Sequence, residues 1–263
     1  MTASQVDTET AIRPDGDGRW ITHLDPAWNI EQNPNGGYAA TSVLRAMQAH
    51  GGFPDPLAVT VHFLRPATSG QDALVVSAVR RSGRSMATMS AGLVQDGKDR
   101  IVAMATFCDL DGREADPAAP PPPPLPEPDD CRDRFGLEQG MDIPLVQRVD
   151  VRIHPDQADA GCADRPMLTG WVRFADDRPP DTLTLALLAD AFPPSAYVSM
   201  GAVGWIPTID LTVHVRRRPV AGWLRARFET HDVSGDQVAE DGTLWDASGQ
   251  IVARTRQTAQ ILR

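Results

Sequence analysis

The chain of 263 residues is poor in three features: long apolar runs, cysteine and excess basic charge. Without an apolar run of about 18 residues, no membrane-spanning helix is expected. The N-terminus, MTASQVDTETAIRPDGDG, lacks the basic start and apolar stretch of a signal peptide. The formal net charge of −10 argues against a nucleic-acid partner. Because 41% of the residues are hydrophobic, the composition supports an apolar core. We also expect a cytoplasmic protein.

Cysteine is scarce and scattered. Cys108, Cys131 and Cys162 are odd in number and widely spaced. They therefore form neither the cluster typical of a metal site nor an obvious disulfide framework. We expect reduced thiols, and neither a metal nor a cofactor.

Proline marks the sharpest break in the chain. The segment ADPAAPPPPPLPEPDD contains five consecutive prolines, which cannot continue a helix or a central strand. Such a run favours an extended polyproline spacer. We therefore predict an N-terminal unit over residues 1–114, a linker over 115–130 and a C-terminal unit over 131–263.

The two units repeat one pattern. LAVTVHFLRP, ending at Pro66, corresponds to IDLTVHVRRRP, ending at Pro219. In both units a Ser-Gly turn, a turn containing Asp and Gly, and a strand beginning IVA follow in the same order. Since Gly supplies the positive φ that tight hairpins need, each unit is expected to hold a four-stranded antiparallel meander. The shared order indicates an internal duplication.

A helix is expected before each set of strands. In the first unit Ala40, Val43, Leu44 and Met47 lie on one helical face. Asn35 is the expected cap and Gly51-Gly52 the expected end.

In the second unit Leu183, Ala186, Leu187 and Asp190 have the same spacing. Asp181 is the expected cap, and the Pro-Pro pair after Phe192 ends the helix. The predicted fold class is α+β: two tandem units, each a helix on an antiparallel sheet, that form one continuous sheet.

The duplication makes each unit a control for the other. In the last strand, alternation places Phe107 of the first unit where the second has Gln257. On the helices, Met47 corresponds to Asp190. A carboxylate on an apolar face is costly unless it is hydrogen-bonded or hydrated. Singly, each is interpreted as a satisfied core group; as a pair on facing elements they favour a functional site.

A third polar change stands before the second TVH. Thr208 corresponds to Pro56 of the first unit. In a regular strand Thr208 and Asp210 would point away from the core-facing Ile209 and Leu211. Pro207 makes a bulge or a strand start possible, which would turn Thr208 inward. Asp210 is the competing carboxylate.

With these features the chain resembles the double-hotdog acyl-CoA thioesterases, the acyl-CoA thioesterase II family. The resemblance rests on NGGYAATSVLRAM, VHFLRPATSG, LLADAFPPS, TIDLTVHVRRRP and IVARTRQ, and it spans about Trp28 to Arg263. It implies hydrolysis of an acyl-CoA substrate to a free fatty acid and CoA. It also implies that Asp190, Thr208 and Gln257 activate the water. A carboxylate can take the proton from water that a hydroxyl and an amide hold in line.

Substrate-binding residues are less distinctive. Arg84 and Arg217 are candidates for the CoA phosphates, although turn and strand-edge arginines are common. Gly36, Gly37 and Tyr38 could aim amides of a helix N-terminus at a ligand oxygen, or simply begin a helix.

Two other functions stay open. A hotdog hydratase or dehydratase acting on an enoyl- or hydroxyacyl-thioester would use His62 or His214 beside Asp210. These histidines occupy matching strand positions, which favours a structural role. A non-catalytic acyl-CoA binding protein would keep the fold without bringing Asp190, Thr208 and Gln257 together. No G-x-S-x-G elbow is present, which argues against an α/β-hydrolase. Pairing of two chains in a homodimer is also expected.

Overall fold

The computed structural model describes residues 4–113, 117–134 and 140–262. The helices are α1 (Gln5–Glu9), α2 (Gly36–Gly51), α3 (Leu185–Asp190) and α4 (Tyr197–Met200). The strands of the first half are β1 (Ile12–Pro14), β2 (Arg19–His23), β3 (Asn29–Ile30), β4 (Asn33–Pro34), β5 (Asp55–Phe63), β6 (Asp72–Ser82), β7 (Met86–Gln95) and β8 (Lys98–Cys108). Those of the second half are β9 (Arg132–Asp133), β10 (Val149–Ile153), β11 (Met167–Phe174), β12 (Thr208–Val215), β13 (Leu224–Ser234), β14 (Gln237–Trp245) and β15 (Ile251–Gln260).

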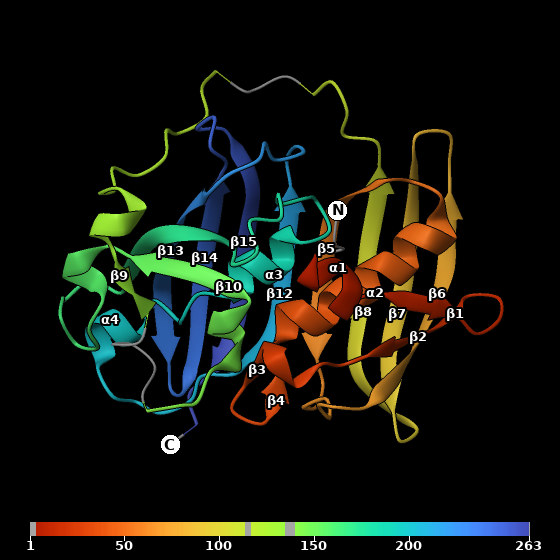
Figure 1. The fold of residues 1–263 in the computed structure, drawn as a ribbon, viewed down its shortest axis with the longest axis horizontal. Helices are drawn as coiled ribbons and strands as arrows, with labels where there is room; N and C mark the ends of the chain where they lie inside the picture. Colours follow the sequence, from red (N-terminus) through yellow and green to blue (C-terminus); the bar gives the residue numbers. More distant parts are fainter. Residues whose placement is uncertain (1–3, 114–116, 135–139, 263) are drawn as a thin grey trace.

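One antiparallel sheet runs through both halves of the chain, in the order β1-β2-β6-β7-β8-β5-β12-β15-β14-β13-β11-β10-β9 (Figure 1). The repeated TVH strands, β5 and β12, pair with each other at its centre. Thr60 lies opposite Thr212, and their hydroxyl oxygens are 3.1 Å apart. The predicted α+β double hotdog with a continuous sheet is therefore confirmed. The boundaries at 114 and 131 stay a prediction.

The predicted meander is wrong in one respect. Only β6, β7 and β8 are joined successively by hairpins, and likewise β13, β14 and β15. The first strand of each set, β5 or β12, crosses over and pairs with the last, β8 or β15. This crossover places β5 beside β12, which is how two repeated units form a single sheet.

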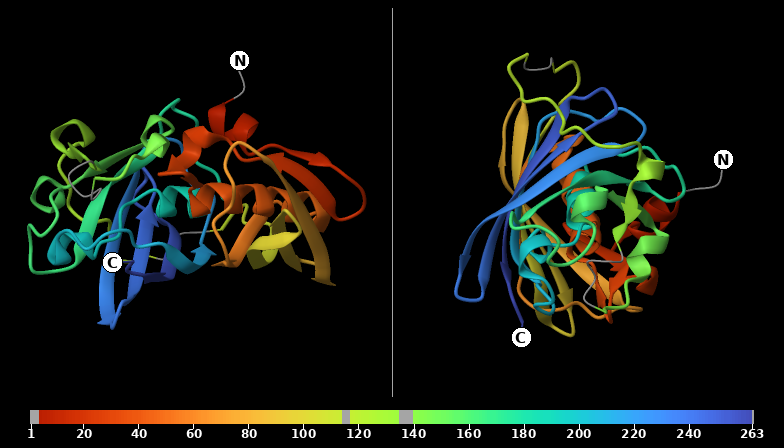
Figure 2. Two further views of the ribbon diagram at one scale, coloured as in Figure 1. Left: turned by 90° about the horizontal axis from the view of Figure 1, so that it is seen from below. Right: turned by 90° about the vertical axis from the view of Figure 1, so that its left-hand side faces the viewer.

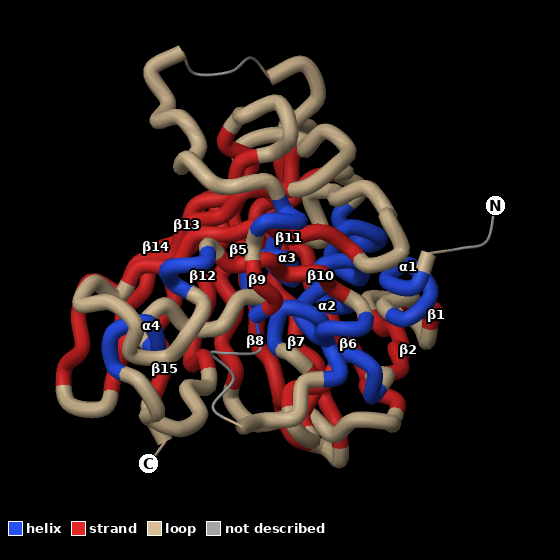
Figure 3. The backbone as a smooth tube through the Cα atoms, turned by 60° about the vertical axis from the view of Figure 1, so that its left-hand side comes forward, coloured by secondary structure: helices blue, strands red, loops and turns tan. Residues whose placement is uncertain are grey.

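The helices cover one face of the sheet (Figures 2 and 3). Helix α2 matches its prediction: Asn35 caps it by accepting from Tyr38 N, and Gly52 ends it in the left-handed region at φ 74°. Helix α3 is shorter than predicted. The Asp181 side chain accepts from Thr184 N in a turn before the helix, so α3 begins only at Leu185.

The proline-rich linker is fastened to the second half where it is described. The indole Nε1 of Trp245 donates to Pro120 O at 3.0 Å, and that of Trp171 donates to Pro126 O at 2.9 Å. Polyproline carbonyls need such donors because the conformation has no internal hydrogen bonds. Two indole donors therefore attach the linker to the second half, at Pro120 and Pro126. Ala115 and Asp116 lie outside the described residues.

Residues 4–113, 117–134 and 140–262 lack two kinds of feature. No helix there is long and apolar enough to cross a membrane. No group of three His, Cys, Asp or Glu side chains there could hold a metal ion. Cys108 and Cys131 are buried free thiols, and Cys162 is exposed.

Candidate active site

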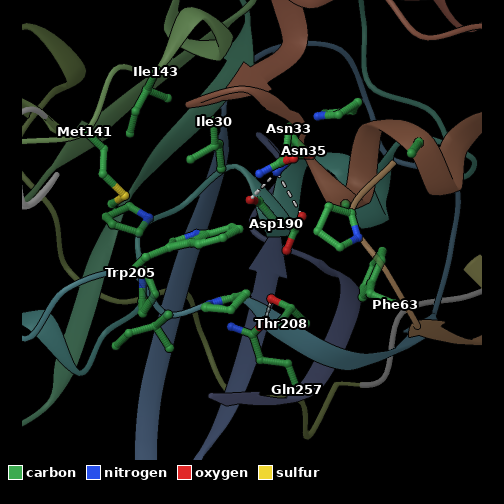
Figure 4. Close-up of a pocket in the computed structure, with 18 of the residues that line it drawn as sticks. Ile30, Asn33, Asn35, Phe63, Met141, Ile143, Asp190, Trp205, Thr208 and Gln257 are labelled. Atoms are coloured by element: carbon green, nitrogen blue, oxygen red, sulfur yellow. Dashed lines mark hydrogen bonds between the residues drawn. The ribbon is translucent and has the colours of Figure 1, made fainter. Parts of the chain in front are cut away.

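A cavity of about 350 Å³ lies where the two halves meet. The N-terminus of α2, the C-terminus of α3 and the adjacent ends of β12 and β15 contribute to its wall. Most of the lining is apolar, and it includes Ile30, Phe63, Ile143, Phe192, Trp205 and Ile206. Asp190, Thr208 and Gln257 line the same cavity (Figure 4). Three polar groups from distant segments therefore converge in an apolar pocket, the usual composition of a small-molecule site.

Asp190 ends α3 and binds the beginning of α2. Its Oδ2 accepts from Gly37 N at 2.8 Å and from Asn35 Nδ2 at 2.9 Å. Within the described part of the chain no group donates to Oδ1, and the carboxylate lies on the cavity side toward Thr208 (Figure 4). One oxygen is thus fixed by the protein and the other is left for a molecule in the cavity.

The environment of Asp190 changes its acidity. Burial raises the pKa of Asp190 from 3.8 to about 6, against the hydrogen bonds from Gly37 and Asn35, which lower it. The nearby Glu240 carboxylate adds to the increase. A carboxyl group with this pKa is ionised at neutral pH and is a stronger base than an ordinary aspartate.

The Gly36-Gly37 pair lets α2 approach α3. A Cβ on Gly37 would lie 2.7 Å from Leu187 Cα and 2.9 Å from Ala186 O, which are both backbone atoms. A Cβ on Gly36 would meet the Phe63 ring at 2.8 Å. The pair is therefore required sterically for Asp190 to reach the amide of Gly37.

A bulge turns Thr208 into the cavity. The pairing of β12 with β15 shifts register between Thr208 and Asp210, so Ile209 becomes 38% exposed while Leu211 stays buried. Thr208 consequently lines the cavity, and its Oγ1 donates to Gln257 Oε1 at 2.9 Å. Pro207, which suggested a bulge in the sequence, lies directly before this strand.

Asp210 and the two histidines lie away from the cavity. Asp210 stands opposite His62 of β5, and His62 and His214 are both exposed on the sheet. None of the three lines the cavity.

Sequence reasoning missed a buried carboxylate behind Gln257. Glu240 Oε1 accepts from Gln257 Nε2 at 2.5 Å. Its Oε2 accepts from Ser195 N at 2.6 Å and from Ser195 Oγ at 2.5 Å. A signal was present: Val238, Glu240 and Leu244 alternate on the core face of β14, as Gln257 does on β15.

The acyl-CoA thioesterase N-terminal domain family matches residues 24–108, and the C-terminal domain family matches residues 117–261. The chain belongs to the acyl-CoA thioesterase family.

Solved structures and a curated relative resemble the chain over most of its length. A candidate thioesterase II from Thermobifida fusca has a TM-score of 0.90 at 30% identity, covering 100% of this chain and 99% of its own. A hot dog protein of unknown function from Alicyclobacillus acidocaldarius has a TM-score of 0.88 at 24% identity over 100% of this chain and 99% of its own, which supports the fold alone. An uncharacterised protein of Mycobacterium tuberculosis is 28% identical over 265 residues, 90% of this chain and 89% of the relative.

In this thioesterase-family chain the substrate-binding candidates separate into two groups. Gly36 lines the cavity and Gly37 binds Asp190, whereas the Tyr38 side chain is buried against Trp28 and donates to Glu9 O. Burial raises the pKa of Tyr38, in keeping with a core position.

The two predicted arginines are not brought to the cavity. Arg84 lies in the β6–β7 turn. Arg217 follows the C-terminal end of β12, whereas Thr208 at the N-terminal end of that strand lines the cavity. Two other arginines line the cavity: Arg65, which is exposed, and Arg134, which donates to Ala191 O. The β-strand spacing alone could not indicate which strand ends surround the pocket.

The matching position in the first half of this thioesterase-family chain is filled. Phe107, the counterpart of Gln257, is buried, as is Asp55 beside Pro56. Asp55 accepts from Arg218 at 2.8 Å and from Thr182 Oγ1 at 2.8 Å. Burial raises the pKa of Asp55, but these hydrogen bonds outweigh it and hold the pKa below its usual value. An ion pair thus occupies this part of the first half.

Proposed function

We propose that the protein is an acyl-CoA thioesterase that hydrolyses an acyl-CoA to the free fatty acid and CoA. The proposal rests on one observation: Asp190, Thr208 and Gln257 line the same apolar cavity. Asp190 Oδ1 accepts no hydrogen bond from the described residues, since both protein donors bind Oδ2. A basic carboxylate beside a hydroxyl and an amide can bind and activate water next to a thioester.

The reaction needs no covalent intermediate. Asp190 Oδ1 takes a proton from water as the water oxygen forms a bond to the acyl carbon. The tetrahedral intermediate then expels the thiolate of CoA, which receives the proton from Asp190. The N-terminus of α2, where Gly36 lines the cavity, offers the amide hydrogen of Gly36 and a partial positive charge for the developing oxyanion, since Gly37 N already donates to Asp190.

The cavity wall supports an acyl substrate. Side chains such as Ile30, Phe192 and Trp205 would surround the acyl chain. Arg65 is the cation we assign to the CoA phosphates, since it is exposed and lines the cavity. The geometry gives no support for that role at Arg84 or Arg217. A cytoplasmic location and a homodimer stay predictions.

The hydratase or dehydratase alternative is less well supported. It requires a histidine with an acidic partner at the reacting atoms, and no described residue of the cavity wall is a histidine. The non-catalytic alternative required Asp190, Thr208 and Gln257 to lie apart, and they line one cavity.

Release of free thiol from a panel of acyl-CoAs tests the proposal. We expect hydrolysis by the wild type and a loss of about 100-fold or more in Asp190→Asn, the usual scale for removing a general base. Asp210→Asn is the matched control, because it removes a carboxylate outside the cavity and should keep the wild-type rate. Turnover by Asp190→Asn at the wild-type rate would contradict the role of Asp190.

A further inference from the structure

A buried chain of polar groups runs from the core to the cavity. Thr230 Oγ1 is 2.9 Å from Ser195 Oγ, and Ser195 in turn donates to Glu240. From the other side Thr208 donates to Gln257, which donates to Glu240. Thr230, Ser195 and Glu240 are all buried, so solvent does not supply alternative partners.

Glu240 gives this chain a direction. Burial raises the pKa of the Glu240 carboxyl, against the hydrogen bonds from Ser195 and Gln257, which lower it. In its ionised form the carboxylate only accepts hydrogen bonds, and three donors converge on it. One of them, Ser195 N, can never act as an acceptor. Against the ionised carboxylate, Gln257 turns its NH₂ group toward Glu240 Oε1 and its own Oε1 toward Thr208.

This direction determines what Thr208 can do in the cavity. Its single hydroxyl hydrogen is donated to Gln257 Oε1, so toward the cavity the Thr208 oxygen can only accept a hydrogen bond. A water bound between Thr208 and Asp190 must then donate a hydrogen to each. The lone pairs of that water are left to face the substrate carbon, which is the orientation that attack requires.

The first half of the chain shows that the fold does not need a carboxylate here. Gln257 stands opposite Glu240 on β14, and its counterpart Phe107 stands opposite Ala87 on β7. Ala87 is buried, as Glu240 is. Burying a charged group in place of an apolar one costs folding free energy. Packing alone therefore does not explain the presence of Glu240 in the second half.

We propose that Glu240 is a positioning residue, which fixes the direction of the hydrogen bonds through Gln257 and Thr208 and so orients the attacking water. The role rests on the proposed thioesterase function.

Glu240→Gln tests the direction of the chain. The oxygen of the new amide must stay on Ser195 N, which places its NH₂ group against the NH₂ group of Gln257. Gln257 should flip, Thr208 should accept from it, and the hydroxyl hydrogen should point into the cavity. We expect kcat to fall about 100-fold with KM nearly unchanged. Asp241→Asn, the neighbouring carboxylate paired with Arg256 on the outside, is the control and should keep kcat.

A double variant separates direction from mere packing. In Glu240→Gln/Gln257→Glu the amide donates to the new carboxylate, which also accepts from Thr208, so the original direction returns. We expect kcat about tenfold above that of Glu240→Gln alone. A single variant with wild-type kcat, or a double variant no better than the single one, would overturn the proposal.

A spectroscopic readout is independent of turnover. In the wild type, NMR cross-relaxation should connect the Gln257 amide hydrogens with Glu240 and not with the Thr208 hydroxyl; in Glu240→Gln the connection to Thr208 should appear. If the wild type hydrolyses no acyl-CoA, the thioesterase proposal fails, and this measurement still decides whether Glu240 sets the direction. An unchanged pattern in Glu240→Gln would refute it.

Discussion

Replacing Asp190 by asparagine should remove the base and yet stabilise the fold at neutral pH. Both hydrogen bonds from the protein go to Oδ2, so an asparagine oxygen in that place keeps Gly37 N and Asn35 Nδ2 satisfied. What disappears is the buried negative charge. Since the pKa of Asp190 rises from 3.8 to about 6, and one unit corresponds to about 1.4 kcal/mol, ionisation costs the folded state about 3 kcal/mol.

The sign of the pH dependence follows from the raised pKa of Asp190. The stability that protonated Asp190 contributes is fully present below 3.8 and is lost as pH rises through about 6. The asparagine variant does not lose it. Its advantage over the wild type should therefore grow from about 1 kcal/mol near pH 4.5 to about 3 kcal/mol near pH 8.

Urea unfolding of both proteins at several pH values measures this difference. Any fixed packing effect of the substitution cancels in the comparison between pH values. Asp210→Asn supplies the baseline for removing one carboxylate outside the cavity. The stability difference between Asp190→Asn and the wild type should grow with pH. A difference that stays constant or shrinks as pH rises would refute the claim that ionised Asp190 destabilises the fold.

Two further substitutions test the geometry. Thr208→Val should lower kcat about 10- to 100-fold, because it removes the oxygen that accepts from the water, while Thr208→Ser keeps most activity; equal rates in the thiol-release assay would exclude that role. Gly37→Ala should cost about 1–3 kcal/mol of folding free energy in urea unfolding, because its Cβ would lie 2.7 Å from Leu187 Cα. Gly83→Ala, with its nearest contact at 3.4 Å, should be tolerated, and equal losses in both variants would argue against the close helix contact.

The duplication explains why much of the site could be predicted. Strand alternation placed Gln257 on the core face, and comparison with Phe107 marked it as a polar departure. The inward turn of Thr208 depended on a bulge, which Pro207 made possible but which only the pairing with β15 establishes. Local pattern therefore identified the residues, and long-range pairing decided their direction.

Other features depend on contacts that no local pattern contains. The crossover that places β5 beside β8 and β12 requires strand pairing between segments far apart in the chain. For the same reason Arg84 and Arg217 could not be placed relative to the cavity. Glu240 was different, because its alternation with Val238 and Leu244 was visible in the sequence.

The central claim is that ionised Asp190 activates the water, and the pH dependence of kcat/KM tests it most directly. An acyl-pantetheine substrate is preferable, since it carries no phosphate that titrates near pH 6. The account predicts that kcat/KM rises about tenfold per pH unit below about 6 and levels off above it, because the free enzyme must lose the Asp190 proton. A profile that stays level through this range, or that falls as pH rises, would contradict it.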